Sequence, residues 1–180
     1  MKKNLSQHIK IPEGVEISFK DGKFFVKGTQ GEISKKINLG KVKLEKKEKE
    51  IILSYEKSTK REKKIINTSV SHIKNMIKGV QEKFEYKLKV CSSHFPITVK
   101  VEGGNAIIKN FLGEKVDRKV KIPGGAEVNV QKDIIIITSP NKEIAGQTAA
   151  NFENATKIKK RDRRIFQDGI YIINKAGKEI

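Results

Sequence analysis

Cysteine, proline and tryptophan are scarce in this chain of 180 residues, which contains one cysteine, four prolines and no tryptophan. A single thiol, Cys91, cannot form an internal disulfide, and with only three well-separated histidines the chain cannot assemble a zinc site of the Cys/His type. No apolar run approaches the roughly 18 to 20 residues that a membrane span requires. These absences predict a soluble protein of the reducing cytoplasm that needs no cofactor and does not bind a membrane.

Acidic side chains are too few to balance the basic ones, since 21 Asp and Glu stand against 39 Lys and Arg, for a net charge of +18. So large an excess of positive charge favours a polyanionic partner, and nucleic acid is the leading class. The hydrophobic share of 36% still allows a core. The length suits one ordinary domain or two small ones and excludes a large multidomain enzyme.

Two stretches of the chain, about 82 residues apart, follow the same pattern. Residues 15–27 and residues 97–109 each alternate apolar and polar positions, turn at a pair of small residues, and alternate again. The turns are Asp21-Gly22 in the first copy and Gly103-Gly104 in the second, and both pairs suit the tight turn of a β-hairpin. The repeat therefore indicates that the chain is a duplication.

A helix closes each copy. In the first copy Thr59 and Glu62 have the spacing of a capping box, and in the second Ser139-Pro140 suits an N-cap followed by the first helical position. Each predicted helix has one mainly apolar face. These faces are Ile66, Val70, Ile73, Ile77 and Val80 in the first copy, and Ala145, Thr148, Ala149, Phe152 and Ala155 in the second.

A second hairpin lies between the first hairpin and the helix in each copy, over residues 42–53 and 128–137, where apolar residues flank a charged turn. We therefore predict an α+β fold of two tandem duplicated domains, residues 1–82 and 83–180. Each domain is an antiparallel sheet of two hairpins with a helix packed on one face, and the second ends in a basic C-terminal tail. We expect the connection between the copies near residues 80–96.

The positive charge is concentrated just after the second predicted helix. Of the eight residues 157–164, six are basic and one is acidic, and this stretch holds three of the five arginines in the chain. Arginine offers a planar fork of donors that suits phosphate, and a basic helix end needs only one or two cations. By contrast, Lys41 to Glu50 mixes lysine with glutamate, which favours a solvated face. The candidate phosphate contacts are Lys157, Lys159, Lys160, Arg161, Arg163 and Arg164.

Catalytic chemistry finds no support in the sequence. His94 has no partner at a recognisable spacing and is interpreted as a structural histidine, and Cys91 is interpreted as a buried thiol. Asp and Glu are scattered among lysines, and no pair has a defensible acid/base arrangement. The sequence therefore predicts that the protein is not an enzyme.

The segment 161–175, Arg-Asp-Arg-Arg-Ile-Phe-Gln-Asp-Gly-Ile-Tyr-Ile-Ile-Asn-Lys, resembles the C-terminal signature of a ribosomal protein family. That signature has the core Arg-x-Phe-x-Asp-Gly-apolar-Tyr. Residues 75–80, 94–97 and 110–115 are also similar to the eukaryotic member, called protein nine of the large subunit. The chain thus resembles the family of the sixth large-subunit ribosomal protein, in its archaeal and eukaryotic branch.

The resemblance implies a structural constituent of the large ribosomal subunit, located in the cytoplasm, that binds large-subunit rRNA near the sarcin-ricin loop and the translation-factor site. Neighbouring ribosomal proteins are the other expected partners, with translation factors nearby, and no homo-oligomer is expected. The alternative is a free RNA-binding or chaperone protein outside the ribosome. That alternative shares the charge and the duplication but does not predict the Asp-Gly-Ile-Tyr ending.

The resemblance also extends the set of candidate RNA contacts beyond residues 157–164. Lys175 is a lesser candidate, and Lys109, Lys115 and Arg118 form a second tier on the loop after the first hairpin of the second copy. Phe166 and Tyr171 either stack on a base or anchor the tail to the second domain's sheet, and the anchor is favoured. Asp168-Gly169 is expected to form the turn before a strand at residues 170–173.

Overall fold

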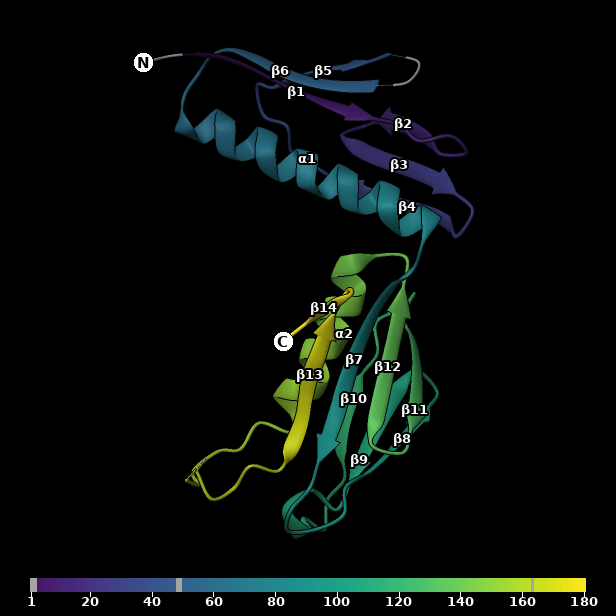
Figure 1. The fold of residues 1–180 in the computed structure, drawn as a ribbon, viewed down its shortest axis with the longest axis vertical. Coiled ribbons are helices and arrows are strands. Elements are labelled where there is room, and N and C mark those ends of the chain that lie inside the picture. Colours follow the sequence, from purple (N-terminus) through teal and green to yellow (C-terminus); the bar gives the residue numbers. More distant parts are fainter. Residues whose placement is uncertain (1–2, 48–49, 163) are drawn as a thin grey trace. The chain divides into compact units, whose positions relative to one another are not determined.

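The computed structural model describes residues 3–47, 50–162 and 164–180, and the chain divides into two compact units, Met1–Lys83 and Phe84–Ile180. Each unit has its own cluster of buried apolar side chains, so each buries a separate core. Figure 1 shows that helix and strands are combined within both units.

The first unit contains two antiparallel sheets of three strands (Figure 1). Its strands are β1 (Lys3–Lys10), β2 (Glu16–Lys20), β3 (Lys23–Gly28), β4 (Gly31–Lys36), β5 (Lys43–Lys46) and β6 (Glu50–Ser58). One sheet has the order β2-β3-β4 and the other the order β1-β6-β5. The turn between β2 and β3 is at Asp21-Gly22, where φ is 50° and 73°. Two successive positive φ values are those of the type I′ turn that favours a tight hairpin, so the predicted turn is confirmed.

The helix α1 (Lys60–Gln81) closes the first unit and packs against strands of both sheets. Its first turn is held by the predicted capping box: the Thr59 side chain accepts a hydrogen bond from the helix backbone, and the Glu62 carboxylate accepts one from the Thr59 N–H. The five predicted apolar positions are all buried. Because these positions recur every three or four residues, they form a continuous face that covers the sheets.

The second unit repeats this arrangement and adds two strands. Its strands are β7 (Phe84–Cys91), β8 (Thr98–Glu102), β9 (Asn105–Lys109), β10 (Arg118–Lys121), β11 (Glu127–Gln131), β12 (Ile134–Ser139), β13 (Gly169–Lys175) and β14 (Lys178–Glu179), with a short 3-10 helix at Phe111–Gly113. The sheet β8-β9-β10 corresponds to β2-β3-β4, and the run β11-β12-β7 corresponds to β5-β6-β1. The strands β13 and β14 extend this second sheet beyond β7.

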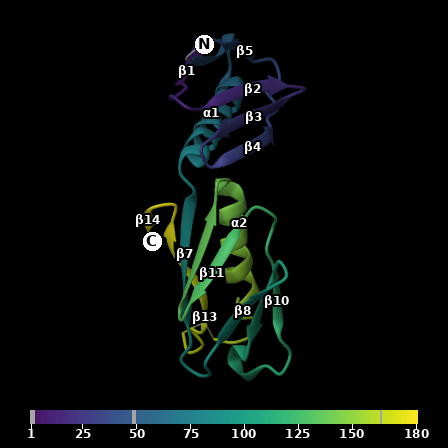
Figure 2. The same ribbon diagram turned by 90° about the vertical axis from the view of Figure 1, so that its right-hand side faces the viewer.

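The helix α2 (Lys142–Ala155) occupies the place of α1 and packs against strands of both sheets (Figure 2). Ala145, Thr148, Ala149 and Phe152 are buried as predicted, whereas Ala155 is half-buried. The N-cap is Asn141 rather than the predicted Ser139, since the Asn141 side chain accepts from the Glu143 N–H at 2.9 Å. Ser139 ends β12, which moves the start of the helix two residues along the chain.

The class predicted from the sequence, an α+β fold of two duplicated copies, is confirmed, but one detail of the prediction is wrong. The two hairpins of each copy do not form one sheet, because β6 and β12 pair with β1 and β7 instead of with the first hairpin. The two units divide between Lys83 and Phe84, within the range 80–96 expected for the connection, and most of that range is the strand β7. Among the described residues, no helix is long and apolar enough to cross a membrane.

Candidate nucleic-acid interface

The basic segment, residues 157–168, connects the end of α2 to the start of β13. Its described cations are exposed, namely Lys157, Lys159, Lys160, Arg161 and Arg164. Arg163 lies outside the described residues. Ile158, which stands between these cations, is only 8% exposed and packs in the core of the second unit. The segment is therefore fixed near its beginning, and its described cations face solvent.

The segment is held at its other end by Asp168, which is 1% exposed. Its carboxylate accepts hydrogen bonds from the backbone N–H groups of Ser93 and His94, at 3.0 and 3.1 Å, and from the Ser93 hydroxyl. The His94 Nδ1 atom lies 3.0 Å from the same carboxylate. We call this set, Asp168 with Ser93 and His94, the clasp. It joins the segment to the loop that follows β7.

The strand register explains why these distant residues meet. The strand β13 runs antiparallel to β7, and Gly169 lies opposite Cys91. Asp168, the residue before Gly169, is therefore placed beside the loop that follows Cys91, and this loop contains Ser93 and His94. The predicted turn at Asp168-Gly169 is thus corrected: Asp168 is a buried acceptor, and the strand already begins at Gly169.

The electrostatics of the clasp favour a charged Asp168. Burial by itself raises the pKa of this carboxyl group, but the hydrogen bonds from Ser93 and His94 outweigh it and hold the pKa well below its usual range. Hydrogen bonds donated to an ionised carboxylate are stronger than those donated to a neutral carboxyl group, so these donors favour the ionised form. The clasp is therefore intact at neutral pH.

Phe166 is covered by two side chains of this region. Its ring stacks on the His94 ring, with centroids 4.9 Å apart and an interplanar angle of 21°. The Arg161 guanidinium lies 4.7 Å from the centroid of the same ring, at a distance that suits a cation–π contact. This arrangement favours the anchor among the two roles predicted for Phe166, because its ring already has partners within the unit.

Tyr171 is placed differently, on β13, and remains 44% exposed. Its hydroxyl donates a hydrogen bond to the Gln167 carbonyl oxygen at 3.0 Å. A Cβ atom at Gly169 would lie 3.1 Å from the Tyr171 ring, so the ring passes close over a residue that has no side chain. Tyr171 is therefore fixed in position while much of its surface stays accessible.

Arg164 and Arg161 act electrostatically on nearby carboxylates. The Arg164 side chain is 90% exposed and pairs with Asp162 at 3.0 Å, which lowers the pKa of Asp162. The positive charge of Arg161 contributes to a lowered pKa at Glu114, after the larger effect of the hydrogen bond from Arg118. An ion pair this exposed contributes little to stability, so Arg164 stays accessible to another anion.

The second-tier candidates differ from one another in their surroundings. Arg118 is half-buried: its guanidinium bonds both Glu114 oxygens and the Ala155 carbonyl oxygen, and it lies 4.2 Å from the Phe111 ring centroid. The guanidinium thus has an internal role in the second unit. Lys115 is exposed, and Lys109 lies 3.5 Å from Asp117.

Lys175 is a predicted contact that the structure places away from the basic segment. It is exposed and stands at the end of β13, whose first residue, Gly169, follows the clasp. Six residues of extended strand separate these positions by about 20 Å at roughly 3.3 Å per residue. Lys175 and the basic segment therefore lie at opposite ends of the strand.

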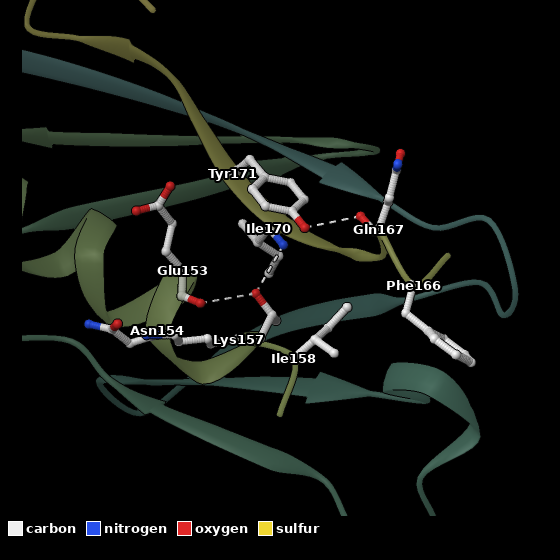
Figure 3. Close-up of a pocket in the computed structure, with 9 residues that line it drawn as sticks. Glu153, Asn154, Lys157, Ile158, Phe166, Gln167, Ile170 and Tyr171 are labelled. Atoms are coloured by element: carbon white, nitrogen blue, oxygen red, sulfur yellow. Dashed lines mark hydrogen bonds between the residues drawn. The ribbon is translucent and has the colours of Figure 1, made fainter. Parts of the chain in front are cut away.

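A cavity of about 330 Å³ opens between the end of α2, the basic segment and β13. Figure 3 shows its lining, with Glu153, Asn154 and Lys157 at the helix end and Gln167, Ile170 and Tyr171 at the strand. Its inner side is held by Thr156, whose hydroxyl oxygen accepts from the Ile170 N–H at 3.0 Å. The sequence interpretation did not include this cavity, because α2, the segment and β13 meet only in the fold.

The fold and the site together define the class of protein. The chain is a strongly basic α+β protein made of two copies of one unit, and the second copy carries an exposed cationic segment. The chain belongs to the ribosomal protein L6 family, since the model of that family matches residues 11–83 and 95–169. The two matched ranges fall on the two copies of the unit, and the resemblance seen in the sequence is thereby confirmed.

Three curated relatives extend along nearly the whole chain. A protein of Methanosarcina mazei is 46% identical over 176 residues, which cover 98% of this chain and 100% of the relative. A protein of Methanobrevibacter smithii is 46% identical over 171 residues, covering 95% and 96%, and one of Methanocella arvoryzae is 43% identical over 171 residues, covering 94% and 97%. Each is named "Large ribosomal subunit protein uL6". The family is one of ribosomal proteins, in agreement with the prediction that the chain is not an enzyme.

Proposed function

We propose that this protein is a structural constituent of the large ribosomal subunit in the cytoplasm, where it binds large-subunit rRNA near the sarcin-ricin loop and the translation-factor site. Membership of the ribosomal protein L6 family supports the ribosomal role, as do relatives that match over almost their full length and carry a large-subunit name. Neighbouring ribosomal proteins are further partners, and translation factors pass nearby.

The observation that carries the RNA-binding proposal is the exposed basic segment fixed at both ends. Ile158 fixes it to the core and Asp168 fixes it to the loop after β7, while the cations that the structure describes between them face solvent. A fixed segment loses less conformational freedom on binding than a flexible tail, so its charges act as a preorganised phosphate site. We assign phosphate contacts to Lys157, Lys159, Lys160, Arg161, Arg163 and Arg164, with Lys109 and Lys115 as further contacts.

Arg118 and Lys175 take other places in this proposal. The donors of Arg118 are used inside the unit, so it supports the end of α2 and the 3-10 loop rather than forming a primary phosphate contact. Lys175 lies at the far end of β13, so it contacts the RNA only if the bound RNA extends past the basic segment to that end of the strand. Phe166 orients Arg161 through the ring contact.

Sedimentation of cell lysate tests the ribosomal role. The protein should stay with the large subunit through a gradient at moderate salt, because many phosphate contacts act together in the assembly. Recovery mainly in free fractions from growing cells would contradict the proposal and would favour the free RNA-binding or chaperone protein, which the net charge of +18 also permits.

The salt dependence of RNA binding tests the segment itself. Replacing Arg161 and Arg164 together by alanine should make the slope of log K against log salt shallower by about 1.4 to 1.8, since each lost phosphate contact removes roughly 0.7 to 0.9. A matched control replaces Lys20 and Lys23, two exposed lysines at the β2–β3 hairpin, and removes the same charge elsewhere. Equal effects of the two double variants would show that bulk charge, and not the segment, sets the affinity.

A further inference from the structure

The cavity beside the basic segment combines an apolar floor with a polar rim. Ile158 and Ile170 are 8% and 1% exposed and form its floor. Asn154 and Gln167 are exposed and line the cavity from its two sides, Asn154 from α2 and Gln167 from the residues before β13 (Figure 3). The Gln167 amide nitrogen donates a hydrogen bond to the Arg164 carbonyl oxygen at 3.2 Å, and its amide oxygen is the acceptor at that side of the rim. An amide both donates and accepts hydrogen bonds, so the rim offers the two kinds of group that the edge of a nucleobase requires.

Tyr171 supplies the aromatic side of the same cavity. Its hydroxyl is bound to the Gln167 carbonyl oxygen, and the missing side chain of Gly169 lets the ring lie close to the strand. The ring is thus oriented before any ligand arrives, although 44% of the residue is exposed. An exposed aromatic ring in a fixed orientation is a stacking surface that costs little entropy to use.

The location of the cavity limits what fills it. Lys157 lines the cavity, and the exposed cations from Lys159 to Arg164 continue along the same stretch of backbone. A polyanion bound to these cations therefore has its backbone next to the cavity opening. The volume of about 330 Å³ is at the lower end of the roughly 300 to 1,000 Å³ typical of small-ligand sites, and so suits one planar group rather than a folded element.

We propose that this cavity takes a single unpaired nucleobase of the bound RNA, stacked against Tyr171 and hydrogen-bonded at its edge by Asn154 and Gln167. The inference rests on the proposed function, since the cations place the RNA backbone that delivers the base. Sequence-dependent RNA recognition commonly uses bases turned out of the helix and stacked on aromatic side chains. The segment then binds the phosphates while the cavity selects the position along the RNA.

Affinity measurements distinguish the base from the phosphates. Tyr171→Leu should weaken binding of the full chain to in vitro transcribed large-subunit rRNA by roughly 5- to 150-fold, the equivalent of about 1 to 3 kcal/mol for one stacked base. The salt slope should stay unchanged, because no phosphate contact is lost. Tyr171→Phe keeps the ring and its close approach to Gly169 but loses the hydroxyl bond that orients the ring, so it should bind more weakly than the wild type and more tightly than Tyr171→Leu.

One matched control and one further variant of the cavity accompany Tyr171→Leu. Phe19→Leu changes an aromatic residue of the first unit that is 39% exposed, and should leave affinity unchanged. Asn154→Ala removes one rim amide from an exposed position and should also weaken binding without changing the slope of log K against log salt. This second variant keeps the test valid if Tyr171→Leu lowers the stability of the fold.

Chemical footprinting of the same RNA completes the test. Wild type should protect the phosphate backbone from hydroxyl radicals and protect one base from reagents that modify its pairing edge. In Tyr171→Leu that base should become reactive while backbone protection persists. Backbone protection without any base whose reactivity depends on Tyr171 would overturn the base pocket, leave the proposed function standing, and point to a protein side chain as the occupant. Absence of backbone protection by the wild type would contradict the proposed function itself.

Discussion

Replacing Asp168 by asparagine tests the clasp with a change of one charge and almost no volume. In the wild type one carboxylate oxygen accepts from the Ser93 N–H, the Ser93 hydroxyl and His94 Nδ1, and the other accepts from the His94 N–H. An asparagine keeps one acceptor oxygen and replaces the other by an amide group that only donates. The His94 N–H then faces a second donor in a buried position.

The magnitude follows from these bonds. An unsatisfied buried donor costs about 1 to 3 kcal/mol, and hydrogen bonds to a charged group are worth roughly 1 kcal/mol more than neutral ones. Asp168→Asn should therefore lower the free energy of unfolding of the second unit by about 3 kcal/mol. The control is Asp162→Asn, which removes a carboxylate from the same segment at an exposed position and should have little effect.

Hydrogen exchange followed by mass spectrometry reports the two units separately. Amides of β7 and β13 that exchange through unfolding should exchange roughly 150-fold faster in the variant, since each 1.4 kcal/mol is a factor of about ten. Peptides from the first unit provide an internal reference and should not change. Equal protection of β13 in wild type and variant would show that the clasp does not stabilise the second unit.

The pH dependence has a defined sign. Because the folded pKa of Asp168 is lowered, its stabilising contribution is fully present above the unfolded pKa of about 3.9 and is lost as the pH falls towards the folded value. The difference in melting temperature between wild type and Asp168→Asn should thus be constant from about pH 5 to pH 7 and shrink below about pH 4. A difference that widens on acidification would refute the assignment of a lowered pKa.

Two packing predictions concern the cores. Gly28→Ala should destabilise the first unit by about 1 to 3 kcal/mol, because the new Cβ would lie 2.9 Å from the Val80 carbonyl oxygen. Gly124→Ala has open space around the new Cβ and should be neutral or stabilising by up to about 1 kcal/mol. Thermal unfolding of both variants checks this, and equal melting temperatures would contradict it. Phe152→Ala should cost the second unit about 3 to 5 kcal/mol, because the ring is 0% exposed, and denaturant unfolding monitored by hydrogen exchange should show the loss in the second unit alone.

Much of the fold was predictable because its signals are local. The turn at Asp21-Gly22 needs only two adjacent residues with positive φ, and the capping box needs only Thr59 and Glu62 three positions apart. The apolar faces of the helices follow from a period of 3.6 residues, which one short window reveals. Local patterns of this kind do not depend on what the element packs against.

Strand pairing was less predictable because it depends on distant partners. The alternation of β7, with Phe84, Tyr86, Leu88 and Val90 buried, is a strand signal in the sequence, but this strand precedes the paired hairpins that reveal the repeat. In β1 the polar Gln7 stands between Leu5 and Ile9 on the inward side and hides the pattern. The division into two sheets could not be deduced, since it follows from β6 pairing with β1.

The candidate site was predicted only in its charged part. Exposure of the described cations at residues 157–162 and at Arg164 follows from their solvation and needs no knowledge of the fold. Asp168 contacts residues 74 and 75 positions away, so no local spacing identifies it as an acceptor. Cys91 is half-buried on β7 rather than buried as expected, because the strand positions facing the core are those of Val90 and Leu88.

A cryo-electron microscopy reconstruction of large ribosomal subunits from the source cells tests the central claim most directly. The proposed function predicts density for both units of this chain, with the segment at residues 157–164 against the rRNA backbone and its arginines within about 3 Å of phosphate oxygens. Large subunits that contain the chain with this segment facing solvent, or that lack the chain altogether, would contradict the account.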